Sequence, residues 1–135
     1  MGGRGSRSLV AWSWVVLALL AAHDVTHALD DGLETGLGEL AAVSLPQWLF
    51  LAVAMAVIVR GDPAHSRLAA LLLGVGVAIG FAVIHLLPFA IAAYWDLHPS
   101  FLSWVLAWVP AVAGLTLAAL AWQELRATAP AAAAT

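Results

Sequence analysis

The stretch LAALLLGVGVAIGFAVIHLL, residues 68–87, decides the fold of this chain. It contains no Asp, Glu, Lys or Arg, and His85 is its only ionisable side chain. About 20 consecutive apolar residues are enough for a helix to cross the hydrocarbon core of a bilayer. Because apolar side chains surround the whole helix, the stretch is typical of a membrane-spanning helix and not of an amphipathic helix on a soluble protein.

Three more apolar runs flank this stretch, and together they predict four helices. We expect the helices over about residues 9–29, 44–59, 68–94 and 101–122. Ser44 is expected to cap the second helix, with Pro46 in its first turn. That helix is short, because residues 45–59 span only about 22 Å at 1.5 Å per residue.

The composition also indicates a membrane protein of one domain. Of its 135 residues, 64% are hydrophobic and only 10% are charged, and the mean hydropathy is +0.98. Soluble domains commonly have about a quarter of their residues charged, so most of this surface must face lipid. We therefore predict an all-α, integral membrane four-helix bundle over residues 1–126, followed by a disordered Ala-rich tail over residues 127–135.

The five basic residues, all arginines, predict how the chain crosses the bilayer. They precede the first run, separate the second from the third and follow the fourth: Arg4, Arg7, Arg60, Arg67 and Arg126. Four crossings place them all on one side, which the positive-inside rule assigns to the cytoplasm. We expect both termini there, in the plasma membrane of a prokaryote-like cell. An alternative is that residues 1–28 are a cleavable signal peptide, which would leave three helices.

Missing residue types exclude several functions. The chain has no cysteine and no lysine, which excludes thiolate metal sites, disulfides, cysteine nucleophiles and Schiff-base chemistry. It has no basic stripe of the kind that binds nucleic acid. The expected partners are the lipid bilayer and either further copies of the chain or a larger membrane complex.

The polar cluster in the first helix is HDVTHALDDGLE, residues 23–34. At 100° per residue, four of its side chains share an arc of roughly 60°: His23, His27, Asp30 and Glu34. Two histidines at i and i+4 can bind one metal ion, and a carboxylate one turn further on can be a third ligand or orient an imidazole. Asp24 and Asp31 form a second carboxylate row. The opposing interpretation is that the helix ends near Ala22 and these are ordinary loop residues.

Depth along the helices adds a third histidine to this cluster. His23 lies roughly 21 Å beyond Leu9 at 1.5 Å per residue. His85 lies roughly 26 Å beyond Leu68 by the same rise, and both helices would run outward. We therefore predict a metal site at the outer leaflet with His23, His27, His85 and Asp30 as ligands. Three carboxylates would orient the ligands or accept protons: Asp24, Asp31 and Glu34.

Three further expectations concern the third helix and the turn that precedes it. Pro88 should weaken the helix around Ile84. The spacing Gly76-x-x-x-Gly80 would let a neighbouring backbone approach closely. His65 should be exposed in the cytoplasmic turn before the helix.

Three chemistries fit the polar cluster. The first is a divalent transition metal used for transport, sensing or hydrolysis, because nitrogen and carboxylate ligands suit zinc, iron, nickel or copper(II). The second is haem b with axial imidazoles from the first and third helices. The third is a proton path through His, Asp and Glu side chains. A different class is a membrane assembly or interaction subunit without chemistry of its own. The metal hypothesis leads, and it is compatible with an enzyme or a transporter.

Overall fold

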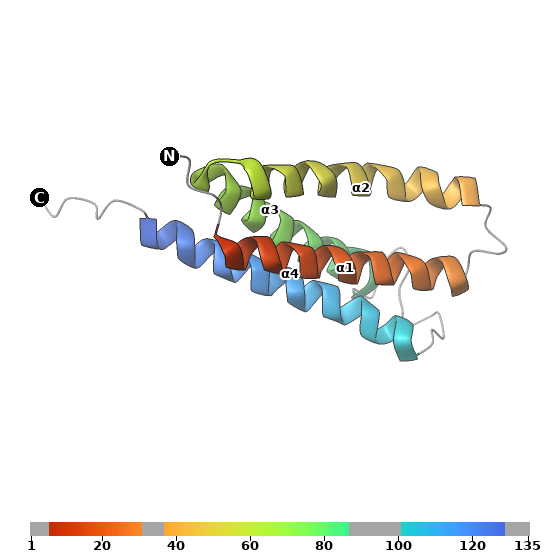
Figure 1. Cartoon of the computed structure of the whole chain (residues 1–135). Coiled ribbons are helices and arrows are strands. Elements are labelled where there is room, and N and C mark those ends of the chain that lie inside the picture. The colour runs from red at the N-terminus through yellow and green to blue at the C-terminus, as the bar shows by residue number, and fades with distance from the viewer. Residues whose placement is uncertain (1–5, 31–36, 87–100, 129–135) are drawn as a thin grey trace, which may run out of the picture.

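A computed structural model describes residues 6–30, 37–86 and 101–128, leaving aside the side chains of 27–30, 37–43, 86, 103 and 104. Within these residues the chain forms α1 (Arg7–Asp30), α2 (Leu37–Arg60), α3 (Pro63–Phe81), a π-helical turn η1 (Ala82–Leu86) and α4 (Phe101–Thr128). The helices lie side by side in a bundle, and α1 begins at the end where α4 ends (Figure 1). The all-α prediction is confirmed.

The second helix is longer than the sequence suggested. It begins at Leu37, so Ser44 does not cap it and Pro46 lies inside it and not in its first turn. The added segment is rich in Leu, Ala and Glu, which are strong helix formers, and the helix forms although Pro46 removes one donor and its ring crowds the preceding turn. At 24 residues, α2 is about 36 Å long at 1.5 Å per residue.

The other helix ends follow local capping chemistry. α3 begins at Pro63 because the Asp62 carboxylate accepts hydrogen bonds from the backbone amides of Ala64 and His65, at 3.0 and 3.1 Å. α4 continues through Thr128, whose hydroxyl donates to the Glu124 carbonyl at 3.1 Å. α4 therefore extends two residues into the segment that was expected to form the tail.

The outward faces of the bundle are apolar. Among the described residues, three helices are long and apolar enough to cross a membrane, over Arg7–Thr26, Pro63–His85 and Val105–Thr128. Large apolar side chains are more than half exposed on each of the four helices, as in Trp14 at 58% and Val53 at 64%. Soluble proteins rarely expose contiguous apolar surface of this extent.

The backbones of α3 and α4 approach each other closely at a pair of glycines. A Cβ added at Gly74 would lie 2.5 Å from the Gly114 carbonyl oxygen and 2.7 Å from the Ala118 amide nitrogen. The predicted close approach at Gly76 and Gly80 is not formed within the described part of the chain, where nothing lies within 4 Å of a Cβ at either position. Gly74, and not the expected pair, therefore sets the helix crossing.

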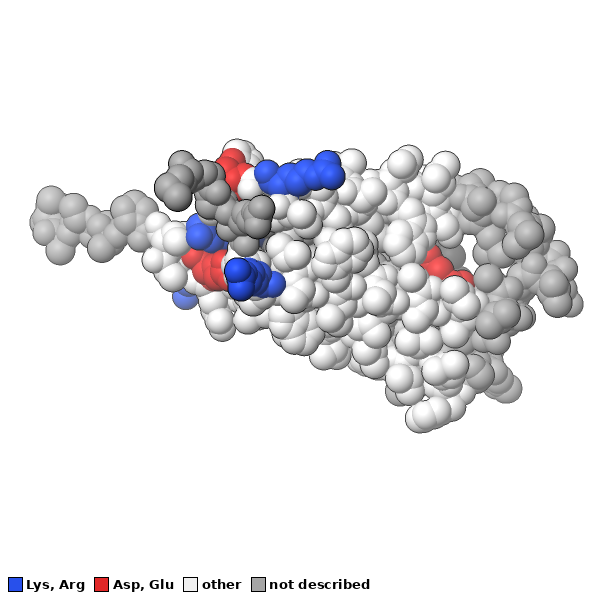
Figure 2. Space-filling view, in the orientation of Figure 1, with Lys and Arg blue, Asp and Glu red and all other residues white. Residues whose placement is uncertain are grey.

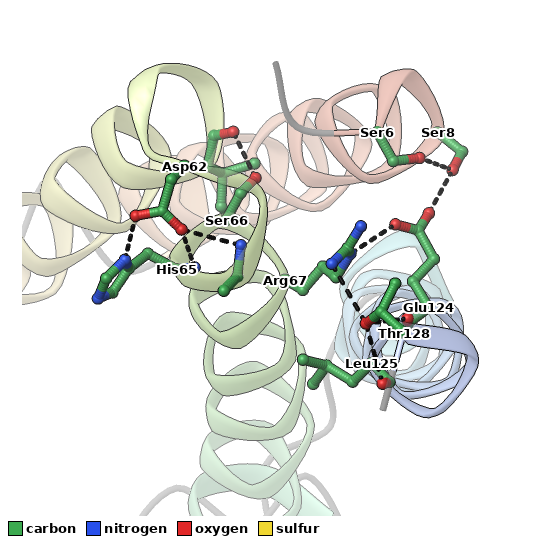
Figure 3. Close-up of polar contacts among 11 residues, drawn as sticks. Ser6, Ser8, Asp62, His65, Ser66, Arg67, Glu124, Leu125 and Thr128 are labelled. Carbon is green, nitrogen blue, oxygen red and sulfur yellow. Dashed lines mark hydrogen bonds and ion pairs between the residues drawn. The ribbon is translucent and has the colours of Figure 1, made fainter. Parts of the chain in front are cut away.

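Charged side chains gather at the end where α1 begins and α4 ends (Figure 2). Arg67 Nε lies 3.5 Å from Glu124 Oε2, which joins α3 to α4. The Ser8 hydroxyl of α1 donates to Glu124 Oε1 at 3.3 Å (Figure 3). On the α3 side, Asp62 also hydrogen-bonds the His65 ring. Polar contacts therefore tie three helices together at this end.

Candidate functional site: a buried histidine pair beside a cavity

His23 occupies a core position on α1. Buried residues recur every three or four positions along this helix, at Leu9, Ser13, Val16 and Leu20, and His23 is next in the series, 3% exposed. α1 remains helical through Asp30, so the interpretation that it ends near Ala22 is wrong. The segment that carries His23 is therefore a helix and not a loop.

His85 continues the corresponding stripe of α3. Leu73, Val77 and Phe81 are buried at helical spacing, and His85 follows one turn later, 6% exposed. The α-helix gives way to the π-helical turn at Ala82–Leu86, which contains this histidine. The expected weakening around Ile84 thus takes the form of a π turn, a feature frequent at functional sites. Pro88, invoked for that weakening, lies outside the described residues.

The two histidine rings are in contact. Their centroids lie 5.0 Å apart with an interplanar angle of 70°, an edge-to-face arrangement. Phe81 packs against both, with its centroid 4.7 Å from that of His23 and 5.5 Å from that of His85. These histidines are 62 positions apart in the sequence, and the similar depths inferred for His85 and the histidines of α1 are consistent with this contact.

Asp24, the next residue on α1, contacts α2. Its Oδ2 atom accepts a hydrogen bond from Trp48 Nε1 at 2.8 Å, and the contact is partly buried. A carboxylate that accepts a hydrogen bond in a partly buried site forms a stronger bond than a neutral acceptor. This contact gives α2 a polar attachment beside the histidine pair.

A cavity of about 420 Å³ lies between α1, α2 and α3. Most of its lining is apolar or aromatic, including Leu20, Phe50 and Phe81. Five polar side chains also reach it: His23, Asp24, Ser44, Gln47 and His85. Pockets that bind small molecules typically have this size and this combination of an apolar wall with a few polar groups.

Not all of the predicted cluster can be placed. The structure brings His23 and His85 together and puts Asp24 on the same cavity. The backbone of His27 and Asp30 continues α1, but their side chains, and the whole of Asp31 and Glu34, lie outside the described residues. Within the described part of the chain, no three His, Asp or Glu side chains are grouped as a metal would require.

The positions of the two histidine rings favour a single metal ion over haem b. Two buried imidazoles from different helices can provide two nitrogen ligands to one small ion. Two imidazoles on opposite sides of a haem iron need ring centres about 6 Å apart, given metal–nitrogen bonds of about 2 Å. The 5.0 Å separation is too short for that arrangement. A bis-histidine haem between His23 and His85 therefore does not fit these ring positions.

The contributions of α2 and of Phe81 to the site were not predicted from the sequence. No sequence pattern singled out Trp48, which donates a hydrogen bond to Asp24, or Gln47, which lines the cavity. In contrast, the prediction for His65 is confirmed, because its side chain is 73% exposed at the start of α3.

No family model, curated protein or solved structure matches this chain. Its function is therefore inferred from the site.

Proposed function

We propose that this chain is an integral membrane protein that crosses the plasma membrane four times, with both termini in the cytoplasm. Support comes from the apolar outward faces and from the four helices, of which α2 is about 36 Å long and the bilayer core about 30 Å thick. The gathering of arginines at one end also suits the positive-inside rule.

Reporter fusions test this topology. A reporter that is active only outside the cytoplasm should be silent when fused after Gly61 or Arg126 and active after Glu34 or Leu97, because the positive-inside rule puts the two Arg-bearing positions inside. Opposite behaviour of the Gly61 and Arg126 fusions would contradict the proposal that both α3 and α4 cross the membrane. A purified protein whose chain starts after residue 28 would be a cleaved product without His23.

We further propose that the His23–His85 pair binds a divalent transition metal ion near the outer leaflet. The observation that carries this proposal is the ring contact of two buried histidines from separate helices. Ionisable residues are costly inside a membrane and are commonly functional where they occur. His27 and Asp30 follow His23 by one and two turns of α1 and would complete the ligand set, with Asp24, Asp31 and Glu34 orienting ligands or accepting protons.

Metal analysis of the detergent-purified protein tests this site. The wild type, incubated with Zn²⁺ or Co²⁺ and then desalted, should retain about one ion per chain. His23→Ala and His85→Ala should each weaken binding more than about 100-fold, because even changes to groups behind the ligands cost 10–100-fold. The Co²⁺ absorption bands of the loaded protein should report nitrogen ligation and disappear in both variants.

His65→Ala is the matched control. It also removes a histidine from this chain, but one that is exposed and hydrogen-bonded to Asp62 at the charged end. It should leave metal content unchanged. Full retention of metal by His85→Ala would contradict a site shared by α1 and α3, and loss of metal in His65→Ala would place the ion at the wrong end of the bundle.

A further inference from the structure

The cavity between α1, α2 and α3 is larger than a metal ion needs, and its lining has features that binding of an ion does not explain. Its volume of about 420 Å³ is far greater than one ion needs and lies in the range of small-molecule pockets. Gly76 and Gly80 line it, and nothing lies within 4 Å of a Cβ at either position. The absence of side chains at these two positions keeps the cavity open.

The polar side of the cavity favours a cation. Asp24 lies on its wall, and its Oδ2 atom accepts a hydrogen bond from Trp48 Nε1 at 2.8 Å. Phe50 and Phe81 also line the space. Aromatic faces next to a carboxylate are a common environment for bound ammonium groups, through charge pairing and cation–π attraction.

The cavity opens onto the outward surface of the bundle. Two of its lining residues, Phe50 and Ile84, are 55% and 41% exposed. In the proposed membrane location, this surface faces lipid tails, so an occupant would enter from the bilayer and carry an apolar tail. The inference rests on that membrane location and does not depend on the metal ion.

We propose that this cavity binds an amphiphile with a protonated amine, its ammonium group at Asp24 and its tail between α2 and α3. The carboxylate provides the charge, the two phenylalanines cover the head, and the two glycines leave room for the first part of the tail. A neutral or anionic head on the same tail lacks the charge pairing and binds more weakly.

Equilibrium dialysis of labelled octylamine against metal-free protein in phosphatidylcholine nanodiscs tests the proposal, with empty nanodiscs subtracted. Octylamine should bind saturably, and octanol and octanoate at least about 10-fold more weakly, as expected for loss of a hydrogen bond to a charged group. Asp24→Asn should weaken octylamine binding by about 10-fold and leave octanol binding unchanged. The asparagine oxygen can still accept from Trp48, which preserves the helix contact.

Gly80→Leu tests the cavity without changing its charge, because nothing lies within 4 Å of an added Cβ and the rest of the larger side chain would take up cavity space. It should abolish saturable binding of all three probes. Val75→Leu is the control, since Val75 lies on α3, is 37% exposed and does not line the cavity. Equal affinity for the amine and the alcohol, or full binding by Gly80→Leu, would overturn the proposal. Metal retention without octylamine binding would refute this inference alone, and the reverse result would refute only the metal site.

Discussion

The two sides of α3 use the same residue type in opposite ways. On one side, Gly74 meets the backbone of α4, and an added Cβ would lie 2.5 Å from the Gly114 carbonyl oxygen. On the other side, Gly76 and Gly80 face the cavity, with nothing within 4 Å of an added Cβ. Residues two positions apart in an α-helix are rotated by about 200° around its axis. Gly74 and Gly76 therefore face different surroundings.

This difference separates a structural interface from a candidate binding site within one helix. The side toward α4 is packed backbone to backbone and lies among fully buried residues such as Leu73 and Leu117. The side toward α2 faces the cavity, and the Trp48–Asp24 hydrogen bond joins the α2 and α1 walls of that cavity. A glycine in a membrane-type helix thus marks close packing only where a neighbour reaches it, and elsewhere it leaves space.

The largest expected effect on stability comes from replacing a glycine by alanine on each of the two sides of α3. Gly74→Ala forces a methyl group against the α4 backbone and should destabilise the protein by about 1–3 kcal/mol. Gly76→Ala meets open space and should stabilise it by about 0.5–1 kcal/mol, because alanine is the better helix former. Unfolding of both variants in mixed micelles, titrated with a denaturing detergent, measures the difference. Equal stabilities would mean that the α3–α4 crossing is not as close as the structure shows.

Sequence alone could predict the four helices and the meeting of two histidines. The helices follow from apolar runs of bilayer length, and the level of His23 and His85 follows from counting residues from Leu9 and Leu68. The inward faces could not be predicted. A helix that is apolar all round gives no periodic signal for the side that faces the core, so nothing distinguished Gly74 from Gly76.

The contribution of α2 to the site could not be predicted from the sequence either, for a different reason. Trp48 is 24 positions from Asp24, and only the packing of α2 against α1 brings the two side chains together. The start of α2 at Leu37 depends on helix propensity overriding a plausible cap at Ser44 and a proline at position 46. Spacing along one helix can group residues on a face, but it cannot choose the partner helix.

The polar attachment of α2 provides the next prediction. Trp48→Phe keeps an aromatic ring but removes the donor to Asp24, and it should cost about 1–2 kcal/mol. A double-mutant cycle with Asp24→Ala, which removes the acceptor, isolates the coupling between the two side chains when it is measured by the same unfolding titration. Strict additivity of the two single changes would show that α2 is held by apolar packing alone, and the cavity wall would then have no polar anchor.

The smallest expected effect on stability concerns the cap at the start of α3, which lies before the glycines that distinguish its two sides. The side-chain hydrogen bond from His65 lowers the pKa of Asp62 below its ordinary 3.8, and the backbone amide of His65 lowers it further. The ionised carboxylate therefore contributes stability above pH 3.8, and this contribution is lost as the pH falls through the lowered pKa. The effect is small because the Asp62 side chain is 58% exposed.

Asp62→Asn removes that titration and still leaves a side-chain oxygen to cap the helix. Thermal unfolding of the wild type should shift to lower temperature between about pH 6 and about pH 3, and the variant should show a smaller shift. Gly74→Ala and Gly76→Ala should each retain the wild-type pH dependence, because neither glycine contacts the capping group. If Asp62→Asn also retained it in full, the responsible carboxylate would lie elsewhere, and Asp24 on the cavity wall would be the next one to replace.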